Sequence, residues 1–165
     1  MQEKTNVAKN YPCSLACVDM AVFKMVDALP LILLARKKDR IEWQLPGGFV
    51  DPDKDTNYET AAKRELIEEC SINMEVDIVH NIGSFKIKDE RYENDKDKVF
   101  STLFVFKYIF GYPIALDDIE EVKWVPWIPS NFKKNNSIGS NTIRDCHRPL
   151  IAQLLRKYYE YAELI

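Results

Sequence analysis

The sequence predicts an α+β domain with a mixed, mainly antiparallel sheet flanked by helices. Apolar and β-branched runs of strand length far outnumber helical patterns, and the two helical patterns stand far apart along the chain. With 165 residues, 46% of them hydrophobic, the chain is large enough to bury one core. We therefore expect a single domain over residues 1–165, with residues 1–12 as a flexible N-terminus.

The strands are predicted from apolar runs bounded by turn residues. The first run covers residues 15–26 and the second covers 31–36, with a turn at 27–30 between them. Further strands are expected at 72–79, 82–87, 99–110 and 121–127. Pro46-Gly47-Gly48 is expected to break regular structure. The charged segment 89–98 is expected to form a solvated hairpin loop, and 131–140 a polar loop.

The first helix is predicted over residues 57–70. Thr56 offers an N-cap, and Glu59 three residues later completes a capping box. Ala62 and Leu66 lie one turn apart and are expected to pack this helix onto the sheet.

The last helix is predicted over residues 148–160, because apolar residues there recur at helical spacing. Its apolar stripe comprises Leu150, Ile151, Leu154, Leu155 and Tyr158.

Charge and hydropathy exclude several classes of partner. The net charge of −3 gives no electrostatic reason to expect nucleic acid or an anionic membrane surface as the partner. The apolar run 29–35 is too short to span a bilayer, and residues 1–10 are too polar for a signal peptide. We therefore expect a cytoplasmic protein.

The four cysteines follow no C-x-x-C spacing, so free thiols are expected. A zinc site from Cys13, Cys17, Cys146 and His147 is the alternative. It is disfavoured because Cys13 and Cys17 fall in or beside an apolar strand, where thiols are ordinary small core residues.

An acidic cluster at the end of the first helix is the sharpest functional signal. Glu65, Glu68 and Glu69 are related by i, i+3 and i+4 and share one helical face. They repel one another, and the C-terminal end of a helix disfavours negative charge. A bound divalent cation would turn both penalties into attraction. A plain surface helix is the alternative, since such helices often contain runs of glutamate.

The wider pattern resembles the Nudix hydrolase superfamily. Leu45-Pro46-Gly47-Gly48-Phe49-Val50 precedes an acidic loop, and Arg64-Glu65-Leu66-x-Glu68-Glu69 follows on the helix. The resemblance implies an α/β/α sandwich that holds Mg²⁺ or Mn²⁺ and cleaves a nucleoside diphosphate linked to another group. Mg²⁺ prefers carboxylate oxygens and retains several waters, which fits the glutamate cluster.

The resemblance assigns roles to individual residues. The implied metal ligands are the Gly48 carbonyl, Glu65, Glu68 and Glu69. Arg64 lies four residues before Glu68 and can hold that carboxylate in place. The implied catalytic residues are Glu65, Glu68, Glu69 and Arg64. Gly47 and Gly48 allow the backbone to approach the substrate closely, and Glu69, Glu93, Glu120 and Glu121 remain alternatives for the general base.

Two positions depart from the Nudix pattern. The acid expected six residues after Gly48 is replaced by Lys54, and Arg64 lies two residues further along than usual. A two-residue insertion explains the spacing, with the missing charge supplied by one of Asp51, Asp53 and Asp55. Ser71 stands where the family usually has glycine, which makes a left-handed helix cap more strained.

Further segments are similar to the ADP-ribose pyrophosphatase branch. They are Val18-Asp19-Met20-Ala21-Val22-Phe23, Leu33-Leu34-Ala35-Arg36, Trp43 to Asp51, Asp89-x-Arg91 and Glu120 to Val125. This branch includes Nudix domains fused to nicotinamide mononucleotide adenylyltransferases and those of NAD-metabolism repressors. The resemblance implies hydrolysis of ADP-ribose to AMP and ribose 5-phosphate, and a homodimer as one oligomeric state.

Arg36 and Arg91 are candidates for binding the diphosphate, because a guanidinium fork suits two oxygens. Alternative substrates are NADH, a nucleotide sugar or an oxidised nucleoside triphosphate. A non-catalytic ligand sensor is the rival from another class. Fewer than 40 residues follow Trp127, so we expect too little chain for a DNA-binding module of the kind that Nudix-like repressors carry.

Overall fold

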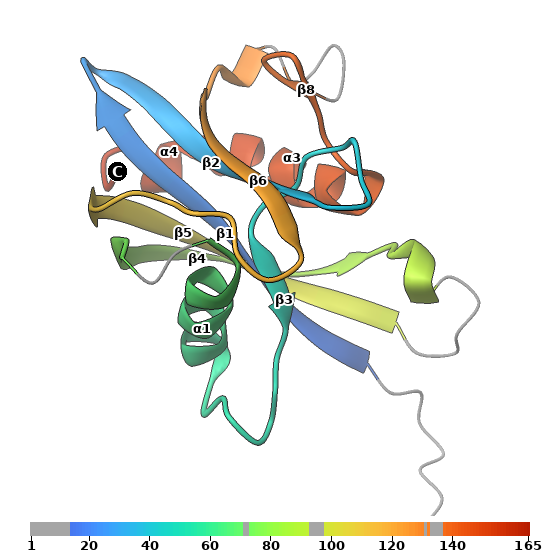
Figure 1. Ribbon diagram of the computed structural model, residues 1–165. Helices are drawn as coiled ribbons and strands as arrows, with labels where there is room; N and C mark the ends of the chain where they lie inside the picture. The colour runs from blue at the N-terminus through green and yellow to red at the C-terminus, as the bar shows by residue number, and fades with distance from the viewer. Residues whose placement is uncertain (1–13, 71–72, 93–97, 131, 133–136) are drawn as a thin grey trace, which may run out of the picture.

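The computed structural model describes residues 14–70, 73–92, 98–130, 132 and 137–165. Its main sheet has six strands, five of them in the order β4-β5-β1-β2-β6, and the sixth, β3, pairs with β1 (Figure 1). Strand β1 is parallel to β5 and antiparallel to β2 and β3. The other pairs, β2 with β6 and β4 with β5, are antiparallel. The mixed, mainly antiparallel sheet confirms the α+β prediction.

The strands and helices have the following bounds: β1 Ser14–Val26, β2 Leu29–Lys37, β3 Gly47–Phe49, α1 Tyr58–Cys70, β4 Glu75–Ile87, β5 Lys98–Phe110, β6 Ile119–Pro126, β7 Ser137–Ile138, β8 Asn141–Thr142, α3 Arg148–Arg156 and α4 Tyr158–Tyr161. Two 3₁₀ turns complete the described elements, at Glu90–Tyr92 and Asp145–His147. No helix among these residues is long and apolar enough to cross a membrane.

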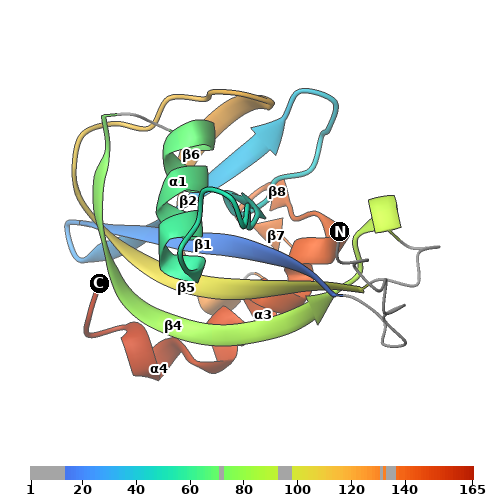
Figure 2. The same cartoon turned by 90° about the horizontal axis from the view of Figure 1, so that it is seen from below.

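Helices cover both faces of the sheet. Figure 2 shows α1 on one side of β1, β4 and β5, with α3 and α4 on the other. The core divides accordingly. Ala62 and Leu66 of α1 pack against one face with Met20 and Phe104, as the sequence predicts. Leu150, Ile151 and Leu154 of α3 pack against the opposite face with Phe23. The result is an α/β/α sandwich.

The β1–β2 hairpin closes through a tight two-residue turn. Val26 pairs with Leu29, which leaves Asp27 and Ala28 as the turn, with φ of 48° and 64°. Two successive positive φ values give the turn a twist that matches the right-handed twist of the two strands it joins. The turn predicted at 27–30 is therefore present, but it is shorter than expected.

Two strand predictions need correction. The segments 72–79 and 82–87 were expected as separate strands, whereas residues 75–87 form the single strand β4. Its pairing with β5 shifts register between Ile78 and His80 and between Asn81 and Gly83. The polar residues near Gly83 mark bulges, which let a strand continue while it bends. Pro46-Gly47-Gly48 likewise does not interrupt the sheet, because Gly47–Phe49 pairs with β1 as β3.

The cap of α1 also differs from the prediction. The Asn57 side chain accepts a hydrogen bond from the Thr60 N–H at 2.8 Å, and Thr60 Oγ1 accepts one from the Asn57 N–H at 3.1 Å. This reciprocal pair is a capping box on Asn57 and Thr60, in place of the expected Thr56 and Glu59. Both alternatives contain the right residue types, and the path of the preceding loop selects between them. Ser71 lies outside the described residues.

The C-terminal half holds three further differences. The predicted helix 148–160 is interrupted at Lys157, where α3 ends and α4 begins after it. The polar loop predicted at 131–140 contains β7 and leads into the β7–β8 hairpin. Segment 89–98 is not wholly solvated, because Asp89 is 5% exposed and is followed by a 3₁₀ turn. Residues 93–97, which include Glu93, lie outside the described residues.

Candidate active site

A cavity of about 260 Å³ opens beside Gly47 and Gly48. Side chains from both faces of the sheet reach this cavity. Here β1 has no pairing with β2, which begins at Phe23, and its residues Cys17–Asp19 pair with the short strand β3 instead. Its lining comprises Cys17, Asp19, Lys37, Gln44, Gly47, Gly48, Phe49, Glu65, Glu69, Ile87, Asp89, Arg91, Asp117, Asp118, Arg144, Cys146 and His147. Five of the eight residues predicted for the site are therefore in the cavity wall.

Glu69 is the most deeply buried member of the acidic cluster, with 4% of its surface exposed. Its Oε2 accepts a hydrogen bond from the Gly47 N–H at 2.9 Å, and Lys37 Nζ lies 3.7 Å from Oε1. Burial raises the pKa of this carboxyl to about 8, even with those two partners. A group held this way gains strongly from a nearby cation.

Glu65 lies against Gly48. A β-carbon at residue 48 would come within 2.3 Å of Glu65 Oε2, so only glycine leaves room for this carboxylate. Burial raises the pKa of Glu65, while the hydrogen bond from Arg64 acts in the opposite direction. The Gly-Gly turn therefore contacts two carboxylates of α1, with Gly47 against Glu69 and Gly48 against Glu65.

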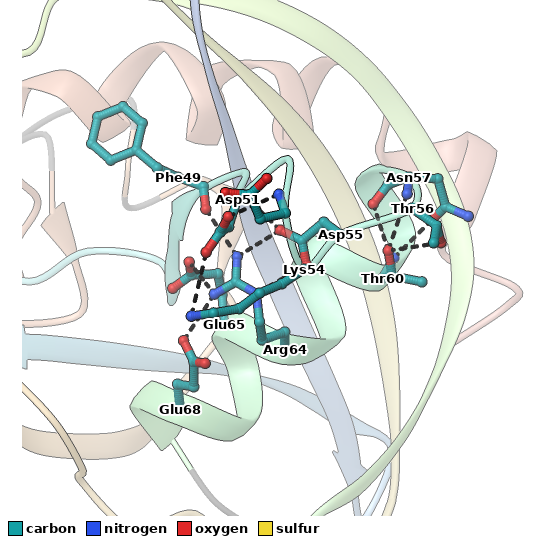
Figure 3. Close-up of polar contacts among 11 residues, drawn as sticks. Phe49, Asp51, Lys54, Asp55, Thr56, Asn57, Thr60, Arg64, Glu65 and Glu68 are labelled. Atoms are coloured by element: carbon teal, nitrogen blue, oxygen red, sulfur yellow. Dashed lines mark hydrogen bonds and ion pairs between the residues drawn. The ribbon is translucent and has the colours of Figure 1, made fainter.

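Arg64 joins the loop to the helix (Figure 3). Its Nε and one terminal nitrogen donate to both carboxylate oxygens of Asp55, at 2.9 and 2.7 Å. Its other terminal nitrogen donates to Glu65 and Glu68, each at 2.8 Å. A further bond of 3.0 Å reaches the Phe49 carbonyl. The guanidinium therefore fixes the orientation of both glutamates.

Among the three acids proposed to replace the missing loop charge, Asp55 is the one that binds Arg64. The bidentate contact lowers the pKa of Asp55 to about 2. Asp51 instead accepts from the backbone N–H of Asp53 and pairs with Lys54. An acid one residue beyond Lys54 therefore meets Arg64.

Glu68 and Arg36 do not line the cavity within the described part of the chain. The Glu68 side chain is 47% exposed and pairs with Arg64. Arg36 pairs with Glu120 and Glu121 and lies over the Trp43 ring. Successive strand residues point to opposite faces. Lys37, not Arg36, therefore points toward the acidic helix.

Arg91 does lie in the cavity wall. Its guanidinium donates to both oxygens of Asp89, at 2.9 and 2.6 Å, and packs over Phe49. Burial raises the pKa of Asp89, but the hydrogen bonds from Arg91 outweigh burial and lower it overall.

Sequence reasoning assigned no substrate role to the wall opposite α1, which Asp19, Gln44, Arg144 and His147 form. It named His147 only in the disfavoured zinc alternative. Asp19 carried a signal, because an acid in the middle of an apolar strand is rarely buried without a purpose. The other three lie in segments without a regular pattern, so only the fold brings them to β1.

The donor set fits a hard divalent cation. The cavity holds six carboxylates against three cationic side chains, and its His147 is neutral because burial lowers the pKa to about 3. Within the described residues, no three His, Cys, Asp or Glu side chains already converge at ligand geometry. The partly buried carboxylate of Glu65 and the buried carboxylate of Glu69 nonetheless supply the oxygen ligands that Mg²⁺ prefers.

The zinc alternative is not supported by the described residues. Cys17, Cys146 and His147 do line one cavity, but they form no metal-binding group there. Burial raises the pKa of the Cys17 thiol well above its usual range and that of Cys146 to about 12. In the absence of a metal, both thiols therefore hold their protons, which zinc would have to displace. Cys13 lies outside the described residues.

The sequence profile of the NUDIX domain matches residues 16–145. The chain belongs to the Nudix family. A curated relative of this Nudix domain is the "ADPR responsive transcriptional repressor NtrR" of Acinetobacter baylyi, 37% identical over 81 residues. The match covers 47% of this chain and 32% of that protein, so it spans about a third of the relative's length.

Solved Nudix structures share the fold. The Nudix domain of Shewanella oneidensis NrtR, in complex with ADP ribose, has a TM-score of 0.66 at 18% identity and covers 96% of this chain and 99% of that one. A bifunctional NMN adenylyltransferase/ADP ribose pyrophosphatase from Francisella tularensis, in complex with AMP and a manganese ion, has a TM-score of 0.56 at 25% identity. That match covers 90% of this Nudix chain and 43% of the other protein.

Proposed function

We propose that this chain binds ADP-ribose or a closely related nucleoside diphosphate together with Mg²⁺ or Mn²⁺, and hydrolyses it. The observation that carries the proposal is the meeting of Glu65 and Glu69 with the Gly47-Gly48 turn at one cavity. An acidic cavity repels a free diphosphate, so a cation is needed to bring the two together.

Glu65, Glu69 and the Gly48 carbonyl are the proposed ligands on the cavity side, and Glu68 is the proposed ligand at its edge. The cation, when bound, polarises the diphosphate and lowers the pKa of a bound water. Arg64 acts as a positioning residue, because it holds Glu65 and Glu68 through hydrogen bonds of 2.8 Å. Glu69 must release its proton to bind a cation, and its raised pKa makes that binding dependent on pH.

The proposed reaction yields AMP and ribose 5-phosphate. ADP-ribose is favoured because the Acinetobacter relative is named as responsive to ADPR and the Shewanella domain was solved with ADP ribose. Arg91, in the cavity wall, is the proposed diphosphate contact. NADH, nucleotide sugars and oxidised nucleoside triphosphates are the alternative substrates to compare.

A second candidate function is an ADP-ribose sensor without turnover. One geometric observation favours it: Arg64 pairs with Glu68, whose exposed carboxylate lies outside the cavity lining. With one carboxylate fewer to hold the cation, binding of ADP-ribose would be favoured over its hydrolysis. The name of the Acinetobacter relative, a transcriptional repressor, points in the same direction.

One experiment separates these functions. Calorimetry with ADP-ribose and Mg²⁺ or Mn²⁺ measures binding, and phosphorus NMR of the same mixture measures cleavage, repeated across the alternative diphosphates. Binding with release of AMP supports the hydrolase, whereas binding of intact ligand supports the sensor. If the folded protein neither binds nor cleaves any member of the panel, both functions are excluded.

A further inference from the structure

A cation that belongs to the chain itself, the ammonium group of Lys37, lies beside α1 in the cavity wall. We propose that Lys37 takes the place of a second divalent cation, so that the site binds a single Mg²⁺ or Mn²⁺. This inference rests on the proposed function and specifies how many cations the acidic residues of the cavity hold.

The strand register directs Lys37 toward α1. Leu33 and Ala35 of β2 pack in the core on the face that α1 covers, and strand alternation puts Lys37 at the end of β2 on that same face. The Lys37 side chain is 19% exposed, so its charge is held largely away from solvent. An ammonium group in such a position is stable only with anionic partners close by.

Two carboxylates from different elements flank this ammonium. Nζ of Lys37 lies 3.7 Å from Glu69 Oε1 and donates a hydrogen bond to Asp118 Oδ2. The other oxygen of Glu69 accepts the Gly47 N–H. The Glu69 oxygen that is left for a cation is therefore the one that faces Lys37. The ammonium thus bridges two carboxylates, as a metal ion does.

Backbone hydrogen bonds hold the loop that carries Asp118. The N–H of Lys38 donates to the Asp118 carbonyl at 3.1 Å, which fixes the loop to the end of β2. The N–H of Leu116 donates to the Glu69 carbonyl at 3.0 Å, which fixes the same loop to α1. Because these bonds involve the main chain alone, the two carboxylates should stay near each other when the ammonium is removed.

The two arginines of the cavity wall are bound to other acids. Arg91 donates to both oxygens of Asp89, and Arg144 pairs with Glu90 at 3.0 Å. Among the described residues that line the cavity, Lys37 is therefore the cation that pairs with an acid of α1. Its charge reduces the repulsion between the carboxylates and opposes the approach of a further divalent ion.

The first divalent ion has ligands that Lys37 does not touch. Glu65 and the Gly48 carbonyl are proposed for that ion in addition to Glu69. A second ion would depend on Asp118 and Glu69, the two carboxylates that the ammonium bridges. An ammonium group donates hydrogen bonds and offers no lone pair to a metal, so a second ion could bind there only if Lys37 were displaced.

The test counts the Mn²⁺ ions bound per chain, from the electron paramagnetic resonance signal of the Mn²⁺ that remains free, without nucleotide. Titrations are run at about pH 8.5, above the pKa of about 8 that burial gives Glu69. We expect one ion for the unmodified chain and for Lys37→Arg, which keeps the charge. We expect two ions for Lys37→Met and for Lys37→Gln, which remove it. Adding Asp118→Asn to Lys37→Met should return the count to one.

Lys38→Met is the matched control, because it removes the same charge one residue later. Lys38 is exposed and its Nζ donates to the Asp117 carbonyl at 2.6 Å, so the count should stay at one. Thermal melting shows which variants are folded. Two ions in the unmodified chain or in Lys38→Met, or one ion in a folded Lys37→Met or Lys37→Gln, would overturn the inference.

The proposed function fails in a different way. If the folded, unmodified chain binds no Mn²⁺ at all, the cation on which that function depends is lost, and the inference is lost with it. A failure of the inference alone still leaves at least one bound ion in the unmodified chain.

Discussion

Gly48 and Glu65 fit together so closely that no side chain is accommodated between them: a β-carbon at residue 48 would stand 2.3 Å from Glu65 Oε2. Gly48→Ala should therefore displace the Glu65 carboxylate, which is the free end of a side chain, and leave the fold intact. We expect loss of Mg²⁺-dependent ADP-ribose binding with little change in Tm. Calorimetry and thermal melting measure the two effects.

Gly47→Ala is the matched contrast. Its β-carbon would meet the backbone carbonyl of Val18 at 2.2 Å, in the β1–β3 pairing itself. The backbone cannot move aside as a side chain can, so we expect a much lower Tm than for Gly48→Ala. Similar melting of the two variants would contradict this reading of the Gly-Gly turn.

Glu69→Gln should keep the fold and abolish the response to Mg²⁺. The amide oxygen can still accept the Gly47 N–H, but the amide cannot ionise to bind a cation. We expect an equal or higher Tm without divalent cation, and no rise in Tm when Mg²⁺ is added. Glu59→Gln on the same helix is the control, because Glu59 is exposed and outside the cavity lining. An equal loss of the Mg²⁺ response in the control would show that the effect is not specific to Glu69.

Stability without divalent cation should fall as the pH rises from about 5 to 8. Burial raises the pKa of Glu69 from 4.5 to about 8 and that of Asp19 from 3.8 to about 7. Between these values the folded chain holds protons that the unfolded chain has lost. Unfolding therefore releases protons, and the free energy of unfolding decreases with pH, on the order of 1 kcal/mol per pH unit for each group.

The pH effect is measured by denaturant unfolding at a series of pH values. His147 acts in the opposite direction below about pH 6.5, because burial lowers its pKa to about 3 and unfolding there takes up a proton. In Glu69→Gln this offsets Asp19, so the decline should be largely absent below about pH 6.5 and should end near pH 7. A stability that rises steadily over this range in the unmodified chain would show that neither carboxyl is protonated in the folded state.

Arg64→Lys should weaken the site by loosening its glutamates. Lysine keeps the charge but cannot reach Asp55, Glu65, Glu68 and the Phe49 carbonyl at once. We expect a Tm lower by several degrees and weaker Mg²⁺-dependent binding. Lys63→Arg, one residue earlier and exposed, should have no such effect. Equal binding by Arg64→Lys and the unmodified chain would exclude the positioning role.

Ala28→Gly should stabilise the β1–β2 hairpin. Ala28 has a φ of 64°, which costs a residue with a β-carbon about 1 kcal/mol more than glycine. The same change at the exposed residue Ala152 in α3 should destabilise by about 1 kcal/mol, because glycine weakens a helix interior. Opposite signs in thermal melting are expected, and a lower Tm for Ala28→Gly would refute the strain at this turn.

The sequence by itself determined the local chemistry. Apolar periodicity located the strands and helices, because each pattern reflects which side of one element is buried. The i, i+3 and i+4 spacing placed Glu65, Glu68 and Glu69 on one helical face, and the residues around Gly47-Gly48 and Arg64 carried the family resemblance. All of these depend on residues that are near one another in the chain.

The tertiary structure decided how the distant segments meet. It selected Asp55 as the partner of Arg64, turned Lys37 rather than Arg36 toward α1, and left Glu68 outside the cavity lining. It also brought Arg144 and His147 against Asp19, across a long stretch of intervening chain. Such contacts depend on strand order, bulges and loop paths, which no local pattern encodes because they arise from packing the whole chain at once.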